Sequence, residues 1–121
     1  MPRALLAEAQ LHSAIRDKVA SHHADIVKTV QAAVAQHPVV VVGMAGNPWP
    51  KKARKALDAA GVAHHDLDFG SYFSDWRRRT ALKMWTGWPT LPMIFVKGQL
   101  VGGATDLQKL IASGELRKLL A

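Results

Sequence analysis

Apolar residues along the chain recur at two spacings, and each spacing predicts a different kind of element. Intervals of three and four residues are typical of amphipathic helices. They place Leu6, Ala9, Ile15 and Val19 on one face of residues 3–20, and they place Ile26, Val30 and Val34 on one face of residues 24–36. Further helices are predicted over residues 48–60, 72–85, 106–113 and 115–120. The two leading helices together predict an α-helical N-terminal third.

Short β-branched and apolar runs predict four strands between these helices. Val39–Val42 is a continuous run of the buried-strand type. Residues 62–69 form the second predicted strand, and the apolar residues that follow Pro92 form the third. Lys97–Gly98 then suits a tight two-residue hairpin turn, since glycine is favoured at its second position. The return strand ends in Gly102–Gly103.

Polar residues, prolines and glycines mark where the helices begin and end. Pro38 ends the second helix. Asn47 is a good N-cap residue, and Pro48 suits the first position of the helix that follows. The inner face of this helix is predicted to consist of Ala53, Ala56, Leu57 and Ala60. Gly61 is expected to end it.

The order of the elements is therefore αα-β-α-β-α-β-β-α, and this order restricts the fold. A β-α-β unit needs a right-handed crossover between parallel strands, whereas the Lys97–Gly98 hairpin joins antiparallel ones. The sequence predicts a mixed four-stranded sheet with helices on both faces. No internal repeat interrupts this order.

Composition narrows the class of protein. A chain of 121 residues that is 49% hydrophobic supports one domain with an ordinary core. The region near the N-terminus has no secretory apolar segment, and Val39–Val42 is too short to span a bilayer. We therefore expect a cytoplasmic protein without a membrane partner. Cysteine is absent, so the chain has no disulfide, no thiolate metal ligand and no redox thiol of its own.

The formal charge of +7 is concentrated in two clusters. The clusters are Lys51, Lys52, Arg54 and Lys55, and then Arg77, Arg78, Arg79 and Lys83. They favour an anionic partner, although each cluster is also what a solvated helix face looks like. No base-reading or RNA-stacking motif accompanies them, so nucleic acid is not the expected partner.

The stretch Trp88-Pro-Thr-Leu-Pro92 carries the clearest signal of a binding site. A proline at the start of a strand lacks the N–H that would join the ladder, so the backbone beside it is left unpaired. Unpaired backbone next to the double glycine Gly102–Gly103 favours docking of an extended peptide. We expect a cis peptide bond between Leu91 and Pro92.

These residues resemble the glutaredoxin family, and the pattern Trp-Pro-Thr-x-Pro, a short hairpin and Gly-Gly is similar in particular to the monothiol glutaredoxins. The resemblance covers about residues 24–121 and implies a thioredoxin-like three-layer α/β fold. Residues 1–23 lie outside it as an N-terminal helical extension. This extension serves either as a dimer contact or as a cover for the sheet, and the sequence does not decide between them.

The resemblance also shows what the chain lacks. The family's active-site motif falls on Asn47-Pro-Trp-Pro50, so Asn47 occupies the former nucleophile position and both cysteine positions are lost. The lysine that in the family supports the thiolate falls on Met44. Asparagine neither attacks a disulfide nor ligates an iron–sulfur cluster. We therefore expect no thiol-disulfide oxidoreductase activity of the chain itself.

The ligand-binding half of the family's site is better preserved, and glutathione is the ligand that the resemblance implies. The family pairs the backbone of the residue before the second proline with the cysteine of glutathione. Arg79 matches the arginine that binds a glutathione carboxylate. Thr105 stands where the family has an acidic residue, and we expect its hydroxyl to cap the helix in that residue's place. The predicted ligand-binding residues are Trp49, Arg79, Thr90, Leu91, Pro92, Gly102, Gly103, Ala104 and Thr105.

Histidine and aspartate residues of the second strand offer a weaker alternative, a metal site. His64 and His65 are adjacent in a strand, so their side chains point to opposite faces. His22–His23 has only Asp25 near it in the sequence. Without cysteine and without paired histidines at helical spacing, no metal is expected.

Three functions follow from these features. The first is non-catalytic binding of glutathione or of an extended peptide in thiol or iron–sulfur homeostasis. The second is a protein-interaction module, with the N-terminal helix or the basic surface as the contact and the pocket as a vestige. The third is an enzyme that uses glutathione itself as the thiol.

Overall fold

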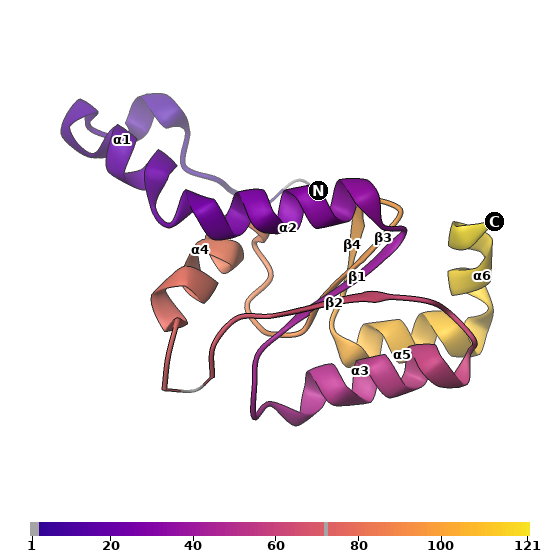
Figure 1. Cartoon of the computed structure of the whole chain (residues 1–121). Coiled ribbons are helices and arrows are strands. Elements are labelled where there is room, and N and C mark those ends of the chain that lie inside the picture. The colour runs from indigo at the N-terminus through magenta and orange to yellow at the C-terminus, as the bar shows by residue number, and fades with distance from the viewer. Residues whose placement is uncertain (1–2, 72) are drawn as a thin grey trace.

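A four-stranded mixed sheet lies between two layers of helices (Figure 1). The computed structural model describes residues 3–71 and 73–121. The strands are Val39–Gly43 (β1), His65–Asp68 (β2), Met93–Val96 (β3) and Gln99–Gly102 (β4). They are ordered β2-β1-β3-β4, with β1 and β2 parallel and the other two pairs antiparallel. The predicted sheet and its strand directions are confirmed.

Helices cover both faces of this sheet. Ala24–Gln36 (α2) and Trp76–Thr86 (α4) lie on one face, while Pro48–Ala59 (α3) and Ala104–Ser113 (α5) lie on the other, followed by Glu115–Leu120 (α6). Val40 and Val42 pack into the core beneath α2, and Val39 and Val41 pack into the core beneath α3 and α5. Successive side chains of a strand point to opposite faces, so the valine run supplies both cores. Its prediction as a buried strand is confirmed.

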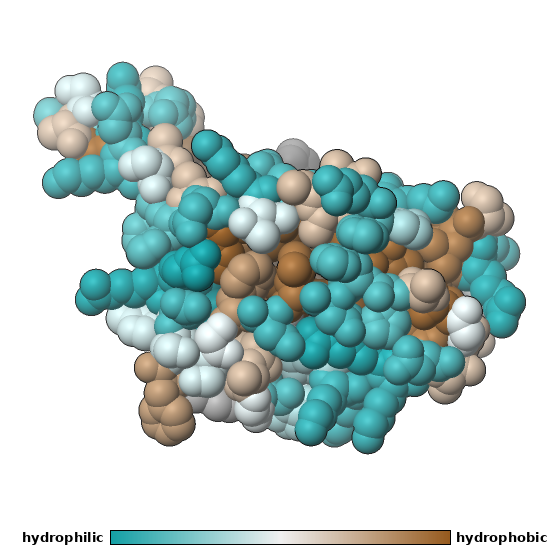
Figure 2. Space-filling model, in the orientation of Figure 1, coloured by the Kyte–Doolittle hydropathy of each residue, from teal (hydrophilic) through white to brown (hydrophobic). Residues whose placement is uncertain are grey.

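The outer surface of the helical layers is mainly polar. Figure 2 shows hydrophilic side chains over the lower layer, where α3 lies, and apolar side chains along the sheet between the two layers. No helix in residues 3–71 and 73–121 is long and apolar enough to cross a membrane.

The hairpin turn and the start of α3 lie where the nearby residues predicted them. Lys97 and Gly98 have φ angles of 50° and 84°, the left-handed pair that a tight hairpin turn requires. Asn47 accepts a hydrogen bond from the Trp49 N–H at 3.0 Å through its side-chain oxygen, and Pro48 is the first residue of α3. The predicted hairpin and the predicted helix start are both confirmed.

The first predicted helix, over residues 3–20, is wrong in extent. A short 3₁₀ helix, Glu8–Gln10 (η1), is followed by Ser13–Ser21 (α1), which His12 caps by accepting the Ala14 N–H at 3.0 Å. The apolar residues on which the prediction rested are exposed, and α1 buries no residue. α1 extends away from the sheet (Figure 1), so it does not cover the sheet, and that alternative is wrong.

The second strand and the helix after it are shorter than predicted. The Val62 N–H bonds to the Leu57 carbonyl at 2.9 Å, so residue 62 belongs to the end of α3 and β2 begins only at His65. α4 begins at Trp76 because the preceding residues form a turn that ends at Asp75 with a φ of 59°. The predicted start at Tyr72 lies outside the described residues.

Candidate functional site

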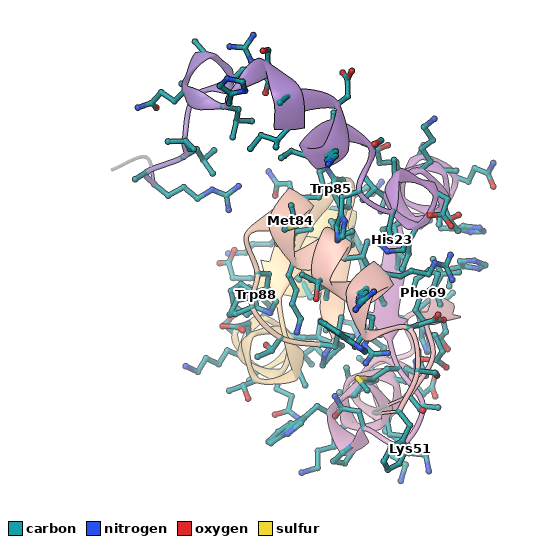
Figure 3. All side chains as sticks on the ribbon, turned by 90° about the vertical axis from the view of Figure 1, so that its left-hand side faces the viewer. His23, Lys51, Phe69, Met84, Trp85 and Trp88 are labelled. Atoms are coloured by element: carbon teal, nitrogen blue, oxygen red, sulfur yellow. The ribbon has the colours of Figure 1, made fainter. Side chains whose placement is uncertain are left out.

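A cavity of about 480 Å³ opens at the end of the sheet where β1 runs into α3. Its wall is drawn from the β1–α3 loop, from α4, from the loop before β3 and from the start of α5. The lining residues are Met44, Asn47, Trp49, Arg79, Lys83, Trp88, Pro89, Thr90, Leu91, Pro92, Gly103, Ala104, Thr105 and Asp106. This volume lies within the range of about 300–1,000 Å³ typical of small-molecule sites. Figure 3 views this end of the molecule, with Trp88 to one side of α4.

The cavity brings together most of the residues singled out in the sequence. All of the predicted ligand-binding residues except Gly102 line it, and so do Asn47 and Met44. Lys83, Trp88, Pro89 and Asp106 also line it and were not predicted. Lys83 lies four residues after Arg79, and the same-face rule for helices identifies it from the sequence.

The N-terminus of α3 has no free hydrogen-bond donor in its first turn. Pro48 and Pro50 have no N–H, and the Trp49 N–H is bonded to the Asn47 side chain. An uncapped helix N-terminus attracts anions through such free N–H groups. Residue 47 therefore presents a neutral amide at a helix end whose N–H groups are absent or paired.

The N-terminus of α5 is different, because its first two amides are available. Gly103 donates its N–H to Asp106 Oδ2 at 3.0 Å, whereas the N–H groups of Ala104 and Thr105 form no hydrogen bond within the described residues. The predicted cap by Thr105 is wrong, since Asp106 provides it. Gly102 has a φ of 113°, and a side chain there would lie 2.7 Å from Asp106 Oδ2, so this glycine shapes the backbone and does not line the cavity.

Arg79 is the one buried charged side chain among the described residues, with 5% of its surface exposed. Its Nη1 donates to the carbonyl of Phe69 at 3.0 Å and to the carbonyl of Ser74. The arginine thus fastens the β2–α4 connection to α4. Its place in the cavity wall also brings positive charge to the site, beside the half-buried Lys83.

The loop before β3 supplies the remaining wall. The Leu91–Pro92 peptide bond is cis, and the backbone N–H and carbonyl of Leu91 form no hydrogen bond within the described residues. The indole N–H of Trp88 is buried and has no hydrogen-bond partner in residues 3–71 and 73–121, while its backbone N–H donates to the Thr86 hydroxyl at 3.1 Å. The loop therefore offers an extended segment of backbone to a ligand.

His64 lies away from this cavity, between two carboxylates. Its Nδ1 is 2.6 Å from Asp66 Oδ1 and its Nε2 is 2.8 Å from Asp58 Oδ1. Burial alone lowers the pKa of His64, but the hydrogen bonds to Asp58 and Asp66 outweigh burial and raise it. His65 points the other way and stacks on His37, as strand alternation predicts. Among residues 3–71 and 73–121, no group of three or more His, Asp or Glu side chains is arranged so that it could hold a metal ion.

Comparison with known sequences identifies relatives along most of the chain. Residues 39–101 match the family model described as Glutaredoxin. A "Glutaredoxin-like protein" of Dictyostelium discoideum is 42% identical over 102 residues, which are 84% of this chain and 83% of that protein. The "Monothiol glutaredoxin-5, mitochondrial" of Schizosaccharomyces pombe is 31% identical over 99 residues, 77% of this chain and 67% of that protein.

Solved structures show the same fold. A structure described as a buckwheat glutaredoxin-glutathione complex superposes with a TM-score of 0.70 and 21% sequence identity, over 83% of this chain and 91% of the other. At this identity, the likeness concerns the arrangement of helices and strands.

Proposed function

Because the chain belongs to the glutaredoxin family, we propose that it is a non-catalytic binding protein for glutathione or for an extended peptide. The observation that carries the proposal is the contrast within one cavity. Most of the predicted ligand-binding residues line this cavity, while Asn47, at the position that the resemblance gives to the nucleophile, serves as a helix cap.

Thiol chemistry by the protein itself has no starting group. Disulfide exchange begins with attack of a thiolate and passes through a mixed disulfide, and the chain has no cysteine. Asn47 adds no alternative, because an amide is not a nucleophile and the α3 terminus beside it has no free N–H to stabilise an anion. Any thiol at this site arrives with the ligand.

The chemical groups of glutathione have counterparts in the cavity. Its two carboxylates suit two separate regions, the cations Arg79 and Lys83 on α4 and the free amides of Ala104 and Thr105 at the start of α5. Its peptide-like middle suits the unpaired backbone of Leu91. Another extended peptide with a terminal carboxylate presents the same groups.

The role that fits such a protein is in thiol or iron–sulfur homeostasis. Monothiol glutaredoxins are among the relatives. With glutathione bound, the ligand's own sulfur is the thiol that the site presents to a partner. Asn47 then stands beside that sulfur as a neutral neighbour.

Isothermal calorimetry with three ligands tests the proposal. Glutathione and S-methylglutathione are expected to bind with similar affinity, because both keep the carboxylates and the peptide backbone. Glutathione diethyl ester is expected to bind at least about tenfold more weakly, since it loses charge-assisted hydrogen bonds of about 1.5–3 kcal/mol each. Absence of heat with all three contradicts the proposal and favours an interaction module with a vestigial pocket.

A coupled assay with glutathione and a mixed-disulfide substrate tests the absence of catalysis. We expect turnover no greater than the blank. Turnover that exceeds the blank and survives repurification favours the third candidate, an enzyme in which glutathione itself is the thiol.

A further inference from the structure

Two tryptophans near the starts of α3 and α4 are exposed, and each has a cation near its ring. Trp49 is 46% exposed and Trp76 is 59% exposed. Lys52 Nζ lies 4.2 Å from the centre of the Trp49 ring, and Arg77 Cζ lies 5.2 Å from the centre of the Trp76 ring. Phe73, three residues before Trp76, is 97% exposed. Exposed tryptophan and arginine are the residue types that contribute most to protein interfaces.

The two tryptophans lie on helices of opposite layers. Trp49 is the second residue of α3 and lines the cavity directly. Trp76 begins α4 and lies three and seven residues before Arg79 and Lys83, which line the cavity from the same helix. Residues at these spacings share a helix face, so Trp76 continues the cavity wall outward.

The surface around the two tryptophans carries unpaired positive charge. Lys51, Lys52, Lys55 and Arg77 are exposed, and none of them forms an ion pair within the described residues. By contrast, Arg54 is paired with Asp66 and Asp68 and Arg78 is paired with Asp25 and Asp75; these pairs are recorded at 2.8–3.5 Å.

Lys51 and Lys55 lie four residues apart on α3, an arrangement that destabilises a helix through like-charge repulsion. Lys51 points outward from α3 in Figure 3. No carboxylate partner offsets this repulsion in the described residues. A bound anion from another molecule would reduce the repulsion between Lys51 and Lys55.

We propose that this rim, formed by Trp49, Trp76, Lys51, Lys52 and Arg77, binds an acidic, extended segment of a partner protein. Carboxylates of the segment meet the cations, and its apolar side chains stack on the tryptophans. The inference goes beyond the proposed function, because Trp49 is the one member of the rim that also lines the cavity.

A peptide fits this surface better than a nucleic acid does. Leu91 lines the cavity, and its backbone N–H and carbonyl are both unpaired within the described residues. A peptide backbone offers an acceptor and a donor to match them, as in strand addition. A DNA backbone offers only acceptors and leaves the Leu91 carbonyl unmatched.

Fluorescence anisotropy with a short labelled peptide that alternates glutamate with leucine tests the inference. At low ionic strength the peptide is expected to bind, and the same peptide with glutamine in place of glutamate is expected to bind at least about tenfold more weakly. Trp76→Ala is expected to lower affinity by about tenfold, and Trp76→Phe to retain most of it. Because Trp76 is exposed, circular dichroism should show that both variants fold.

Charge variants test whether the peptide binds to the rim itself or responds only to the protein's net charge. Lys51→Gln combined with Lys52→Gln is expected to weaken binding by about tenfold, whereas Lys28→Gln combined with Lys109→Gln removes the same charge from exposed sites elsewhere and is expected to have no effect. Equal losses in the two double variants overturn the proposal, because they show a response to net charge alone.

Two further measurements complete the test. Tighter binding of a single-stranded oligothymidine than of the peptide, with the same sensitivity to Trp76→Ala, overturns the assignment of a protein partner. Glutathione affinity in Trp76→Ala is expected to be unchanged, because Trp76 does not line the cavity. Peptide binding without glutathione binding then supports the rim while contradicting glutathione as the ligand of the cavity.

Discussion

At the level of single residues, Asn47 caps the start of α3 beside the cavity. Its side-chain oxygen satisfies the Trp49 N–H, and prolines on either side of Trp49 contribute none. A helix start that in other proteins stabilises a thiolate is therefore paired internally. At the α5 end, by contrast, the N–H groups of Ala104 and Thr105 have no partner within the described residues and remain available to a ligand.

Replacing Asn47 with cysteine tests this view of the α3 terminus. The Trp49 N–H becomes free to donate to the thiolate, and the helix terminus contributes about 0.3–1 kcal/mol. At 1.36 kcal/mol per unit, the thiol pKa should fall below the free value of about 8.5, by less than about one unit. The rate of iodoacetamide alkylation against pH measures it.

Ala59→Cys is the matched control, at an exposed position near the other end of the same helix. Each variant contains a single thiol because the natural chain has none. An alkylation midpoint for Asn47→Cys at or above that of Ala59→Cys means that residue 47 is not at the helix terminus.

We expect substitution of Arg79 to affect mainly stability, and substitution of Lys83 to affect mainly ligand binding. Arg79→Ala leaves the carbonyls of Phe69 and Ser74 without their donor, and the buried Phe69 carbonyl left unpaired costs about 1–3 kcal/mol. We expect Arg79→Ala to lower the free energy of unfolding substantially in urea denaturation. Lys83→Gln should leave it unchanged within about 0.5 kcal/mol while weakening glutathione binding about tenfold. Unchanged affinity in Lys83→Gln places the ligand carboxylate elsewhere.

His64 makes stability depend on pH. A neutral imidazole donates from one nitrogen only, so two carboxylate partners at 2.6 and 2.8 Å require the charged form. Its pKa is raised on folding, because the hydrogen bonds to Asp58 and Asp66 outweigh burial. The stabilisation is therefore complete below the unfolded pKa of about 6.5, and it is lost as pH rises through the raised folded value.

Urea denaturation of the natural protein and of His64→Gln at a series of pH values measures this contribution. The difference in unfolding free energy should shrink as pH rises from acid-neutral to alkaline conditions. In the background Asp58→Asn with Asp66→Asn, the same comparison should show little dependence on pH. A constant difference in the natural background contradicts the charged bridge.

At the level of elements, the sequence correctly predicted the helices and strands whose beginning or end is marked by nearby residues. α2, β1, the start of α3 and the hairpin combine an apolar pattern with a proline, a cap or a glycine, and each lies where predicted. The N-terminal pattern failed because its apolar spacing has no partner surface. α4 starts late because of the backbone conformation at Asp75, which no residue type in that turn signals.

Removing residues 3–21 tests how far α1 contributes to the domain. α1 buries no residue, and the recorded hydrogen bond from this segment to the body runs from Arg3 Nη1 to the Thr86 carbonyl at 2.9 Å. We expect the shortened protein to fold and to lose no more than about 1–2 kcal/mol, the size of one or two hydrogen bonds. Thermal denaturation with circular dichroism checks this. Failure to fold shows that α1 packs against the domain.

At the level of the whole molecule, the fold gathers into one cavity four segments that are distant in the sequence. The sequence alone predicted a ligand site at Trp88–Pro92 and Gly102–Thr105, because proline and glycine have recognisable effects on the backbone. The capping role of Asp106 depends on where α5 begins. The hydrogen bond from Arg79 to the Phe69 carbonyl depends on the path of the β2–α4 turn. Both required the three-dimensional structure.

Titrating glutathione into nitrogen-15-labelled protein provides the sharpest test of a ligand site without a thiol. We expect saturable, reversible shifts of the amide signals of Leu91, Gly103, Ala104 and Thr105, and an unchanged protein mass after the ligand is removed. Millimolar glutathione that leaves these four amides unmoved would contradict a retained ligand site, and a stable gain in mass would contradict binding without covalent chemistry.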